Sequence, residues 1–420
     1  MILDRIHHPS HRVSTANLQV VYPGIAQASL GPRGVYIGRD YHGGSFCYDA
    51  WELYARGHLT GPNMLVLGQI GRGKSAFVKT LVYRSLNFNR QAIMLDPKGE
   101  NGPLCRAVGT SPIALKPGGT VRLNPLEAIN VDGMDATDVL HGRVAVVSAV
   151  LGATLQRVLT PEESVAIEGA VADATDSETI PTLRGVVTGL LEPSANAATR
   201  AHTTTALLAE TSRTIGFALR RLVDGDLRGM FDGRTSGNVD LDGRLVSFDL
   251  SALYQSSALG ILMTCVAAWL QDKLRKPDGR KRVVVLDEAW AVLGNMETAE
   301  WLAGSYKLAR SYGVQYIAVL HRLSDLLAAG PEGSRQMKLA RGILSDSETV
   351  VAYSQPPSEV ATTRDLLELN EREAECITQL PRASALWKVG RRSFLVQHLL
   401  ATGERAVIDT DAQMRTGVTQ

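Results

Sequence analysis

Residues 68–75 read Gly68-Gln69-Ile70-Gly71-Arg72-Gly73-Lys74-Ser75 and fit the pattern G-x-x-x-x-G-K-[ST]. The aliphatic run Met64–Leu67 before them predicts a buried strand, and Ala76–Leu86 after them has the apolar spacing of a helix. Glycines in such a place let the backbone curl, so that successive N–H groups point inward at phosphate oxygens. This context favours a phosphate-binding loop over a glycine-rich turn with a chance Lys-Ser pair.

The residue types of the loop suggest that it binds a nucleoside triphosphate together with a divalent cation. Lys74 would place a positive charge on the β- and γ-phosphates of ATP, and the Ser75 hydroxyl would ligate Mg²⁺. The positive end of the following helix dipole adds to the attraction. We therefore predict that ATP binds to a contiguous set of residues, which are Gly68, Gln69, Ile70, Gly71, Arg72, Gly73, Lys74, Ser75 and Ala76.

The second signal is a pair of acidic residues after the run Val283–Leu286. The aliphatic residues of this run predict a strand buried on both faces. The next two residues are Asp287 and Glu288. Many buried strands end in a solvated acid, so this pair carries weight only in combination with the phosphate loop. In that combination, Asp287 is predicted to hold Mg²⁺ and Glu288 to polarise the attacking water.

The remaining pattern predicts an α/β fold with a mostly parallel sheet, an all-α insertion and a C-terminal β-hairpin. Strand, helix and strand at the spacing of residues 64–95 form a βαβ unit. Further strands are predicted at Leu245–Leu250, Val314–Leu320 and Thr349–Tyr353, a hairpin at Gly34–Tyr48, and a closing hairpin from Ala383–Lys388 and Ser393–His398. Helices are predicted at Ser257–Arg275 and Thr298–Tyr312.

These elements suggest four segments. Residues 1–32 form an extended N-terminal segment, 33–134 the first part of the α/β core with the phosphate loop, 135–228 the helical insertion, and 229–420 the second part of the core with the acidic strand end and the closing segment. The insertion is predicted from apolar residues at helical spacing in five stretches, which are Val139–Leu155, Glu162–Ala174, Leu183–Leu191, Thr204–Glu210 and Thr214–Leu222.

Several other residues have two interpretations each. The turn Asp96–Glu100 is either a ligand-binding loop or a charged turn, and His321 is either a sensor of the γ-phosphate or a solvated side chain. His7, His8 and His11 bind a metal or belong to a mobile tail. The basic run of Arg213, Arg220, Arg221, Arg228 and Arg234 is either a solvated helix face or a surface for DNA or a partner.

Composition limits the function classes. The chain has 44 basic and 43 acidic residues, so a contact with DNA requires a local patch or a pore built from several subunits. Four well-separated cysteines argue against structural zinc and favour a reducing compartment. The N-terminus does not read as a signal peptide, and the most apolar helical stretch, Gly260–Leu270, is too short to span a bilayer. We therefore expect a cytoplasmic protein with no transmembrane segment.

Four stretches together resemble the conjugative type IV secretion ATPases (VirB-type and TraC-like motors) of the FtsK–HerA superfamily. The first is Gly38-Arg39-Asp40 with Gly43-Gly44 and Asp49, leading into Asn63–Gly68, and the second is Leu95–Glu100. The third is Phe231-Asp232-Gly233 followed by Val246–Ser251, and the fourth and most specific is Leu286-Asp287-Glu288-Ala289-Trp290. Leu367–Val396 looks like the closing segment of that family, and the resemblance covers roughly residues 33–412.

The resemblance implies a RecA-like P-loop NTPase sheet that carries a helical insertion. It implies Mg²⁺-dependent ATP hydrolysis by a homo-oligomer, most often a hexamer, with ATP at subunit boundaries. It also implies work with secretion or conjugation components at the inner face of the cell membrane, with DNA as a further partner. Hydrolysis in such a ring calls for an arginine from the neighbouring subunit, and Arg382 is the first candidate and Arg310 the second; Arg341 and Arg391 are weaker. Three features depart from the family: the short N-terminal segment, His321 where Gln is usual, and Arg72 where a small residue is usual.

Two alternatives stay open. The first is a DNA translocase or coupling motor of the same superfamily, which would show DNA-stimulated ATPase activity. The second is a nucleotide-gated assembly scaffold that turns over little ATP.

Overall fold

The computed structural model describes residues 29–408 except residues 42, 128–134, 238, 255, 257, 275–278, 291–295 and 325–333. The predicted α/β class is confirmed, because the strands form one sheet in the order β2-β1-β11-β10-β9-β3-β8-β7-β4-β6-β5. The tail histidines His7, His8 and His11 lie outside the described residues.

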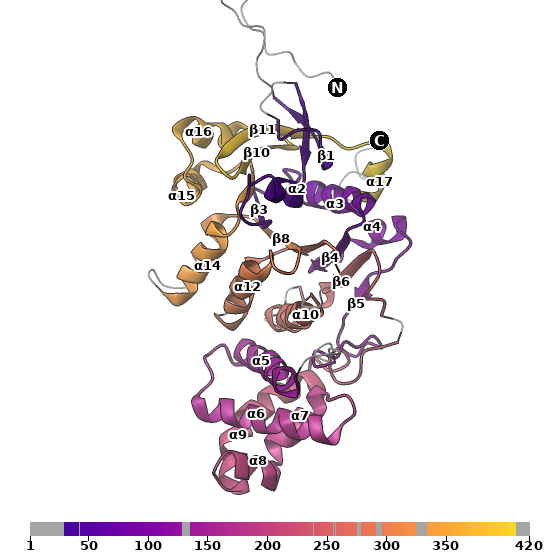
Figure 1. Ribbon diagram of the computed structural model, residues 1–420, viewed down its shortest axis with the longest axis vertical. Coiled ribbons are helices and arrows are strands. Elements are labelled where there is room, and N and C mark those ends of the chain that lie inside the picture. Colours follow the sequence, from indigo (N-terminus) through magenta and orange to yellow (C-terminus); the bar gives the residue numbers. More distant parts are fainter. Residues whose placement is uncertain are drawn as a thin grey trace, which may run out of the picture.

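Seven neighbouring strands of this sheet run parallel (Figure 1). They are β9 (Thr349–Tyr353), β3 (Met64–Leu67), β8 (Val314–Leu320), β7 (Arg282–Leu286), β4 (Gln91–Asp96), β6 (Leu245–Asp249) and β5 (Ile113–Ala114). All the carboxyl ends of these strands therefore meet at one edge of the sheet. The strand β8 separates β3 from β7, so the phosphate loop and the acidic pair end two strands apart.

Helices cover both faces of the sheet, and alternate side chains of each strand enter different cores. Leu65 and Leu67 pack with α10 (Leu259–Leu274), α12 (Met296–Leu308) and α14 (Arg335–Ser345). Met64 and Val66 pack on the opposite face with α3 (Lys74–Ser85) and α4 (Gly102–Ala107). Figure 1 shows these two helical layers on either side of the strands. Continuous aliphatic runs such as Val283–Leu286 are required because both faces are buried.

The closing hairpin occupies the interior of the sheet. β10 (Ser384–Val389) pairs antiparallel with β9, and β11 (Arg392–His398) pairs antiparallel with β10 and with β1 (Val35–Asp40). The edge of the sheet is β2 (Ser45–Tyr48), which pairs with β1. Two helices after β9, α15 (Pro357–Leu367) and α16 (Glu371–Gln379), precede this hairpin, and neither was anticipated from the sequence.

Residues 135–228 form helices and no strand, and all of them are described. The helices are α5 (Ala136–Leu155), α6 (Pro161–Ser177), α7 (Leu183–Leu191), α8 (Ala195–Arg200) and α9 (Thr205–Val223), which gather at one end of the molecule in Figure 1. The two stretches predicted at Thr204–Glu210 and Thr214–Leu222 are one helix, and the predicted break between them is wrong. The Ser212 hydroxyl donates to the Leu208 carbonyl at 2.7 Å, so a polar residue continues the helix.

Helix α5 is the one helix among the described residues that is apolar and long enough to cross a membrane by length and composition alone. The stretch Gly260–Leu270, which the sequence pattern identified as the most apolar, lies in the shorter helix α10. A core helix of a globular domain passes the same criterion, and α5 packs against α6, α9, α10 and α12. We therefore treat α5 as a packed helix of the insertion.

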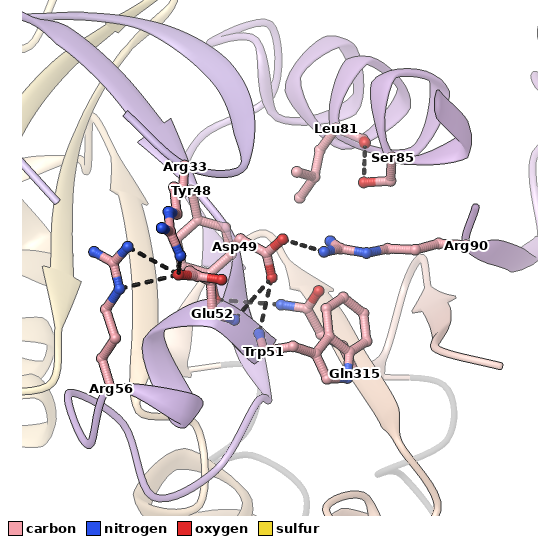
Figure 2. Close-up of polar contacts among 10 residues, drawn as sticks. All are labelled: Arg33, Tyr48, Asp49, Trp51, Glu52, Arg56, Leu81, Ser85, Arg90 and Gln315. Carbon is pink, nitrogen blue, oxygen red and sulfur yellow. Dashed lines mark hydrogen bonds and ion pairs between the residues drawn. The ribbon is translucent and has the colours of Figure 1, made fainter. Parts of the chain in front are cut away.

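The amino edge of the parallel strands holds a buried polar cluster (Figure 2). Asp49 begins α2 (Ala50–Ala55): it accepts hydrogen bonds from the amides of Trp51 and Glu52 at 3.0 and 3.1 Å and forms an ion pair with Arg90. The Arg90 guanidinium lies over the Trp51 ring, 4.2 Å from its centroid.

The tyrosine that ends β2 extends this cluster to two further strands. The Tyr48 hydroxyl donates to Thr349 Oγ1 at 3.0 Å and accepts a hydrogen bond from Gln315 Nε2 at 3.3 Å. These contacts attach the N-terminal hairpin to the first residues of β8 and β9.

Candidate active site

The loop between β3 and α3 is shaped by three glycines. Gly68, Gly71 and Gly73 have φ values of +148°, +77° and +110°, which L side chains rarely adopt. A Cβ at Gly68 would come 2.4 Å from Cβ of Tyr353, whereas one at Gly71 would meet open space. Gly73 precedes α3 and provides no side-chain cap, so the first N–H groups of the helix point into the loop. This backbone fits an anion such as a phosphate group.

The side chains of the loop differ in where they point. Lys74 is 5% exposed, and its Nζ donates to the carbonyl oxygens of Gly68 and Gln69. Ile70 is 81% exposed and projects outward. The Arg72 guanidinium donates to Gln69 Oε1 at 3.3 and 3.2 Å, which holds it along the loop. Burial lowers the pKa of Lys74 to about 8, although Asp287 acts in the opposite direction.

Two adjoining cavities open beside the loop. A cavity of about 160 Å³ is lined by residues 70, 71 and 73–76 of the loop and by Lys98, Glu100, His321, Arg382 and Ile408. A larger one of about 400 Å³ extends from Gly73 and Ala76 along α3 to Phe77, His398 and Leu400. The first cavity therefore offers polar groups that can bind phosphate, and the second offers an apolar wall against which a nucleoside can pack.

The acidic pair follows β7. Burial and the neighbouring Glu288 carboxylate raise the pKa of Asp287 to about 6. Glu288 is 2% exposed and has a φ of +53°, a left-handed conformation that is costly for a residue with a side chain. Among the described residues no group of three His, Cys, Asp or Glu side chains could hold a metal. A Mg²⁺ ion would thus be held by Asp287 and Ser75 together with phosphate oxygens, which suits its preference for few protein ligands.

Three donors surround the Glu288 carboxylate. Lys98 Nζ lies 2.5 Å from Oε1, His321 Nε2 lies 2.9 Å from the same oxygen, and Trp290 Nε1 donates to Oε2. Burial alone would raise the pKa of Glu288, but the bonds from His321 and Lys98 outweigh it and lower the pKa to about 2. For Lys98, burial favours the neutral form, and the contact with Glu288 overcomes this and raises its pKa.

The turn Asp96–Glu100 brings Lys98 to this position. The Asp96 carboxylate accepts hydrogen bonds from the amides of Lys98 and Asn101 at 3.3 and 2.8 Å. Lys79 of α3 donates to the Glu100 carbonyl at 3.0 Å. The sequence pattern left open whether this segment is a charged turn or part of the site. The segment is a turn stabilised by hydrogen bonds to the Asp96 carboxylate, and its central residue, Lys98, lines the cavity. Only the parallel pairing of β4 with β7 reveals the contact between Lys98 and Glu288.

The two predicted arginines lie at opposite edges of the sheet. Arg382 precedes β10, whose antiparallel direction brings its first residue to the carboxyl edge of β9, and it lines the smaller cavity of its own chain. The amide of Ala383 donates to the Arg72 carbonyl at 3.0 Å. The expectation that Arg382 acts only on a neighbouring subunit is therefore not required by its position. Arg310 is exposed between α12 and β8, at the amino edge and away from this chain's cavity.

The basic run at the end of the insertion is only partly helical. Arg213, Arg220 and Arg221 lie on α9, whereas Arg228 and Arg234 follow that helix. Arg220 lies 3.5 Å from Asp224, and Arg221 lies 2.8 Å from Asp226. Asp224 is shared with Arg184 at 2.8 Å. Acidic side chains thus neutralise part of the surface that was considered for DNA.

Comparison with known proteins gives the same fold. Residues 56–208 match the protein family described as an AAA-like domain. VirB4 of Thermoanaerobacter pseudethanolicus is 20% identical, with 90% of this chain and 100% of that chain covered and a TM-score of 0.71. The plasmid coupling protein TrwB in complex with ADP and Mg²⁺ is 16% identical, with 93% of each chain covered and a TM-score of 0.60.

TrwB in complex with the non-hydrolysable ATP analogue ADPNP is 17% identical, with 81% of this chain and 86% of that chain covered and a TM-score of 0.58. No curated protein sequence matches the chain. At these identities the structural likeness describes the fold and leaves the chemistry to the residues of the site. Residues 56–208 thus resemble an AAA-like domain, and the chain has the fold of the VirB4 and TrwB proteins.

Proposed function

We propose that this protein hydrolyses ATP with Mg²⁺ and uses the cycle to drive conjugative DNA transfer or transport of the type IV secretion kind. The observation that carries the proposal is the meeting of a buried Lys74, in a glycine loop at a helix start, with Asp287 and Glu288 from a strand two positions away in the sheet. The likeness to VirB4 and to nucleotide-bound TrwB supports the same function.

Each side chain then has a role. Lys74 binds the β- and γ-phosphates, Ser75 and Asp287 hold Mg²⁺, and Glu288 orients and deprotonates the attacking water. Mg²⁺ neutralises charge on the phosphates when it is bound. The apolar wall formed by Phe77 and His398, whose rings stack at 4.5 Å, offers a surface for the nucleoside.

We further propose that the active form is a homo-oligomeric ring, a hexamer, at the cytoplasmic face of the membrane, where secretion or conjugation components would dock it. The likeness to two proteins of conjugation machinery supports such partners. Mixing Arg382→Ala subunits with Glu288→Gln subunits tests the ring. Restored turnover indicates that the arginine acts on a neighbour, and no restoration indicates that it acts on its own chain.

Two observations favour alternative functions. The likeness to TrwB favours a DNA-coupling motor, for which DNA would stimulate hydrolysis and binding would weaken steeply as salt rises. The three donors on Glu288 favour a scaffold that binds ATP with little turnover. Single-turnover hydrolysis by the purified protein separates the scaffold from the motor.

The central test compares binding with turnover. Glu288→Gln should keep its affinity for ATP but hydrolyse ATP about 10²–10⁴-fold more slowly, because an amide can hold a water molecule but cannot accept its proton. Lys74→Ala should lose ATP affinity by about 1.5–3 kcal/mol, the contribution of a charged hydrogen bond. Calorimetric titration and phosphate release measure the two quantities, and Glu375→Gln, at an exposed position, is the control. Unchanged hydrolysis in Glu288→Gln would refute the assignment of the base.

A further inference from the structure

We propose that Lys98 recognises the terminal phosphate of ATP, and that it holds the Glu288 carboxylate until that phosphate is present. This inference rests on the proposed function and adds a residue that distinguishes ATP from ADP. The loop residues bind the phosphates that ATP and ADP share, and Lys74 also reaches the γ-phosphate. Lys98 would add a second positive charge at that γ-phosphate and so increase the difference between the two nucleotides.

The backbone delivers Lys98 to the position where it can do this. Its turn follows β4, and β4 pairs in parallel with β7, which ends at Asp287. The Asp96 carboxylate binds the amides on both sides of the turn, so the turn is held in one conformation. Lys98 then lines the smaller cavity together with Lys74, Ser75 and His321.

The present contacts weaken Glu288 as a base. A base needs an oxygen lone pair directed at the water it deprotonates. Here Oε1 faces both Lys98 Nζ at 2.5 Å and His321 Nε2 at 2.9 Å, and Oε2 accepts from Trp290, so three of the roughly four lone-pair sites of the carboxylate are taken. Release of one donor from Oε1 would therefore make that oxygen available to the attacking water.

Lys98 is the donor best able to move. Lys98 and His321 are equally exposed, each at 26% of the side chain, and Trp290 is 39% exposed. The lysine differs from both because it carries its charge on a flexible stem and not on a rigid ring. The neighbouring Lys79 is 4% exposed and bound to the Glu100 carbonyl and carboxylate, so it is not available. Lys74 lies deeper, on the carbonyls of Gly68 and Gln69.

The competitor for Lys98 would be the charge that ATP carries beyond ADP. A γ-phosphate beside Lys74 adds an anion to the cavity that Lys98 already lines. An ammonium between a carboxylate and a phosphate group distributes between the two, and Mg²⁺-bound phosphate oxygens remain strong acceptors. Transfer of Lys98 to the phosphate frees Glu288 Oε1 to accept from water. ATP thereby releases the base that acts on it, and ADP does not.

The experiment compares the affinities of the full-length protein for ADPNP and ADP, each with Mg²⁺, by isothermal titration calorimetry. Lys98→Gln keeps a polar side chain of similar length and removes the charge. It should weaken ADPNP binding about tenfold, near the lower end of a charged hydrogen bond, and change ADP binding less than twofold. Lys98→Arg should retain most of the preference for ADPNP over ADP. Lys116→Ala, at an exposed loop position, should leave both affinities unchanged.

The two hypotheses fail in different ways. If wild-type protein binds neither nucleotide, the proposed function is wrong. If wild-type protein binds and hydrolyses ATP but Lys98→Gln weakens ADPNP and ADP by the same factor, or weakens neither, the role of Lys98 is refuted. Thermal unfolding monitors the fold of each variant, and Lys98→Met gives a second uncharged side chain if Lys98→Gln is unstable.

Discussion

The two edges of the parallel sheet each hold a pair of opposite charges, Asp49–Arg90 at the amino edge and Glu288–Lys98 at the carboxyl edge. At the amino edge both side chains are less than a tenth exposed, and Arg90 stacks on Trp51. At the carboxyl edge Glu288 is buried in a left-handed conformation, while Lys98 reaches a cavity.

The difference separates a pair that holds the fold from one that is available for chemistry. Asp49 accepts two backbone amides besides Arg90, so its position is set by α2 itself (Figure 2). Among the described residues, the donors to the Glu288 carboxylate are side chains, and its backbone has a left-handed φ of +53°. One of these donors, Lys98, is partly exposed and can move toward solvent. A buried ion pair therefore says little about function until its surroundings are known.

The largest effect that would test this comparison is on stability. Asp49→Ala should lower the free energy of unfolding by about 3–5 kcal/mol, because Arg90 is left as a buried unpaired charge. Glu288→Gln should change it by less than about 1 kcal/mol, because Lys98 can turn to water. Urea unfolding followed by circular dichroism measures both. Equal losses in the two variants would show that the pairs do not differ in this way.

A smaller effect tests how Tyr48 ties the N-terminal hairpin to the core. Tyr48→Phe should destabilise the protein by about 1–3 kcal/mol, because it leaves Gln315 and Thr349 with fewer partners in a buried place. Tyr41→Phe is the matched control, since Tyr41 is largely exposed and its hydroxyl contacts Ser384 at 3.3 Å. A Tyr48→Phe variant as stable as Tyr41→Phe would contradict the role of this contact.

The smallest effect asks whether a buried polar group near the carboxyl edge is also structural. His398 accepts from Trp387 Nε1 at 2.9 Å and contacts the Tyr353 hydroxyl, and burial, with a smaller effect of Arg84, lowers its pKa to about 3. The unfolded chain therefore binds a proton below about pH 6.5 that the folded chain does not. Stability contributed by neutral His398 is complete above pH 6.5 and is lost as the pH falls toward 3.

The stability of the wild type should thus fall more steeply than that of His398→Gln between pH 6.5 and 5, by at most about 1.4 kcal/mol per pH unit. Denaturant unfolding at several pH values measures the two slopes. Parallel slopes would mean that His398 titrates alike in the folded and unfolded chains.

Much of the fold was accessible from local pattern. The aliphatic runs of β3, β7 and β8 mark strands buried on both faces, and the glycine loop marks the point where a strand gives way to a helix. These signals are contiguous in the chain, and each results from a steric or burial requirement of a few neighbouring residues. The residues of the phosphate loop and the acidic pair were nameable for the same reason.

Contacts between distant segments were not accessible in this way. Lys98 and Glu288 come from strands separated by the whole helical insertion, and their meeting depends on β4 being the neighbour of β7. Arg382 lies at the carboxyl edge of the sheet because β10 runs antiparallel to β9, and no short sequence pattern specifies this direction.

The division follows from the range of the forces involved. Backbone geometry and burial act on adjacent residues, so a strand, a glycine loop or a helix start can be identified in the chain itself. Strand order and strand direction arise from the packing of all the elements at once, and they bring Lys98, His321 and Trp290 around Glu288. The phosphate loop and the acidic pair could therefore be predicted from the sequence. The side chains that contact Glu288 could be identified only from the tertiary structure.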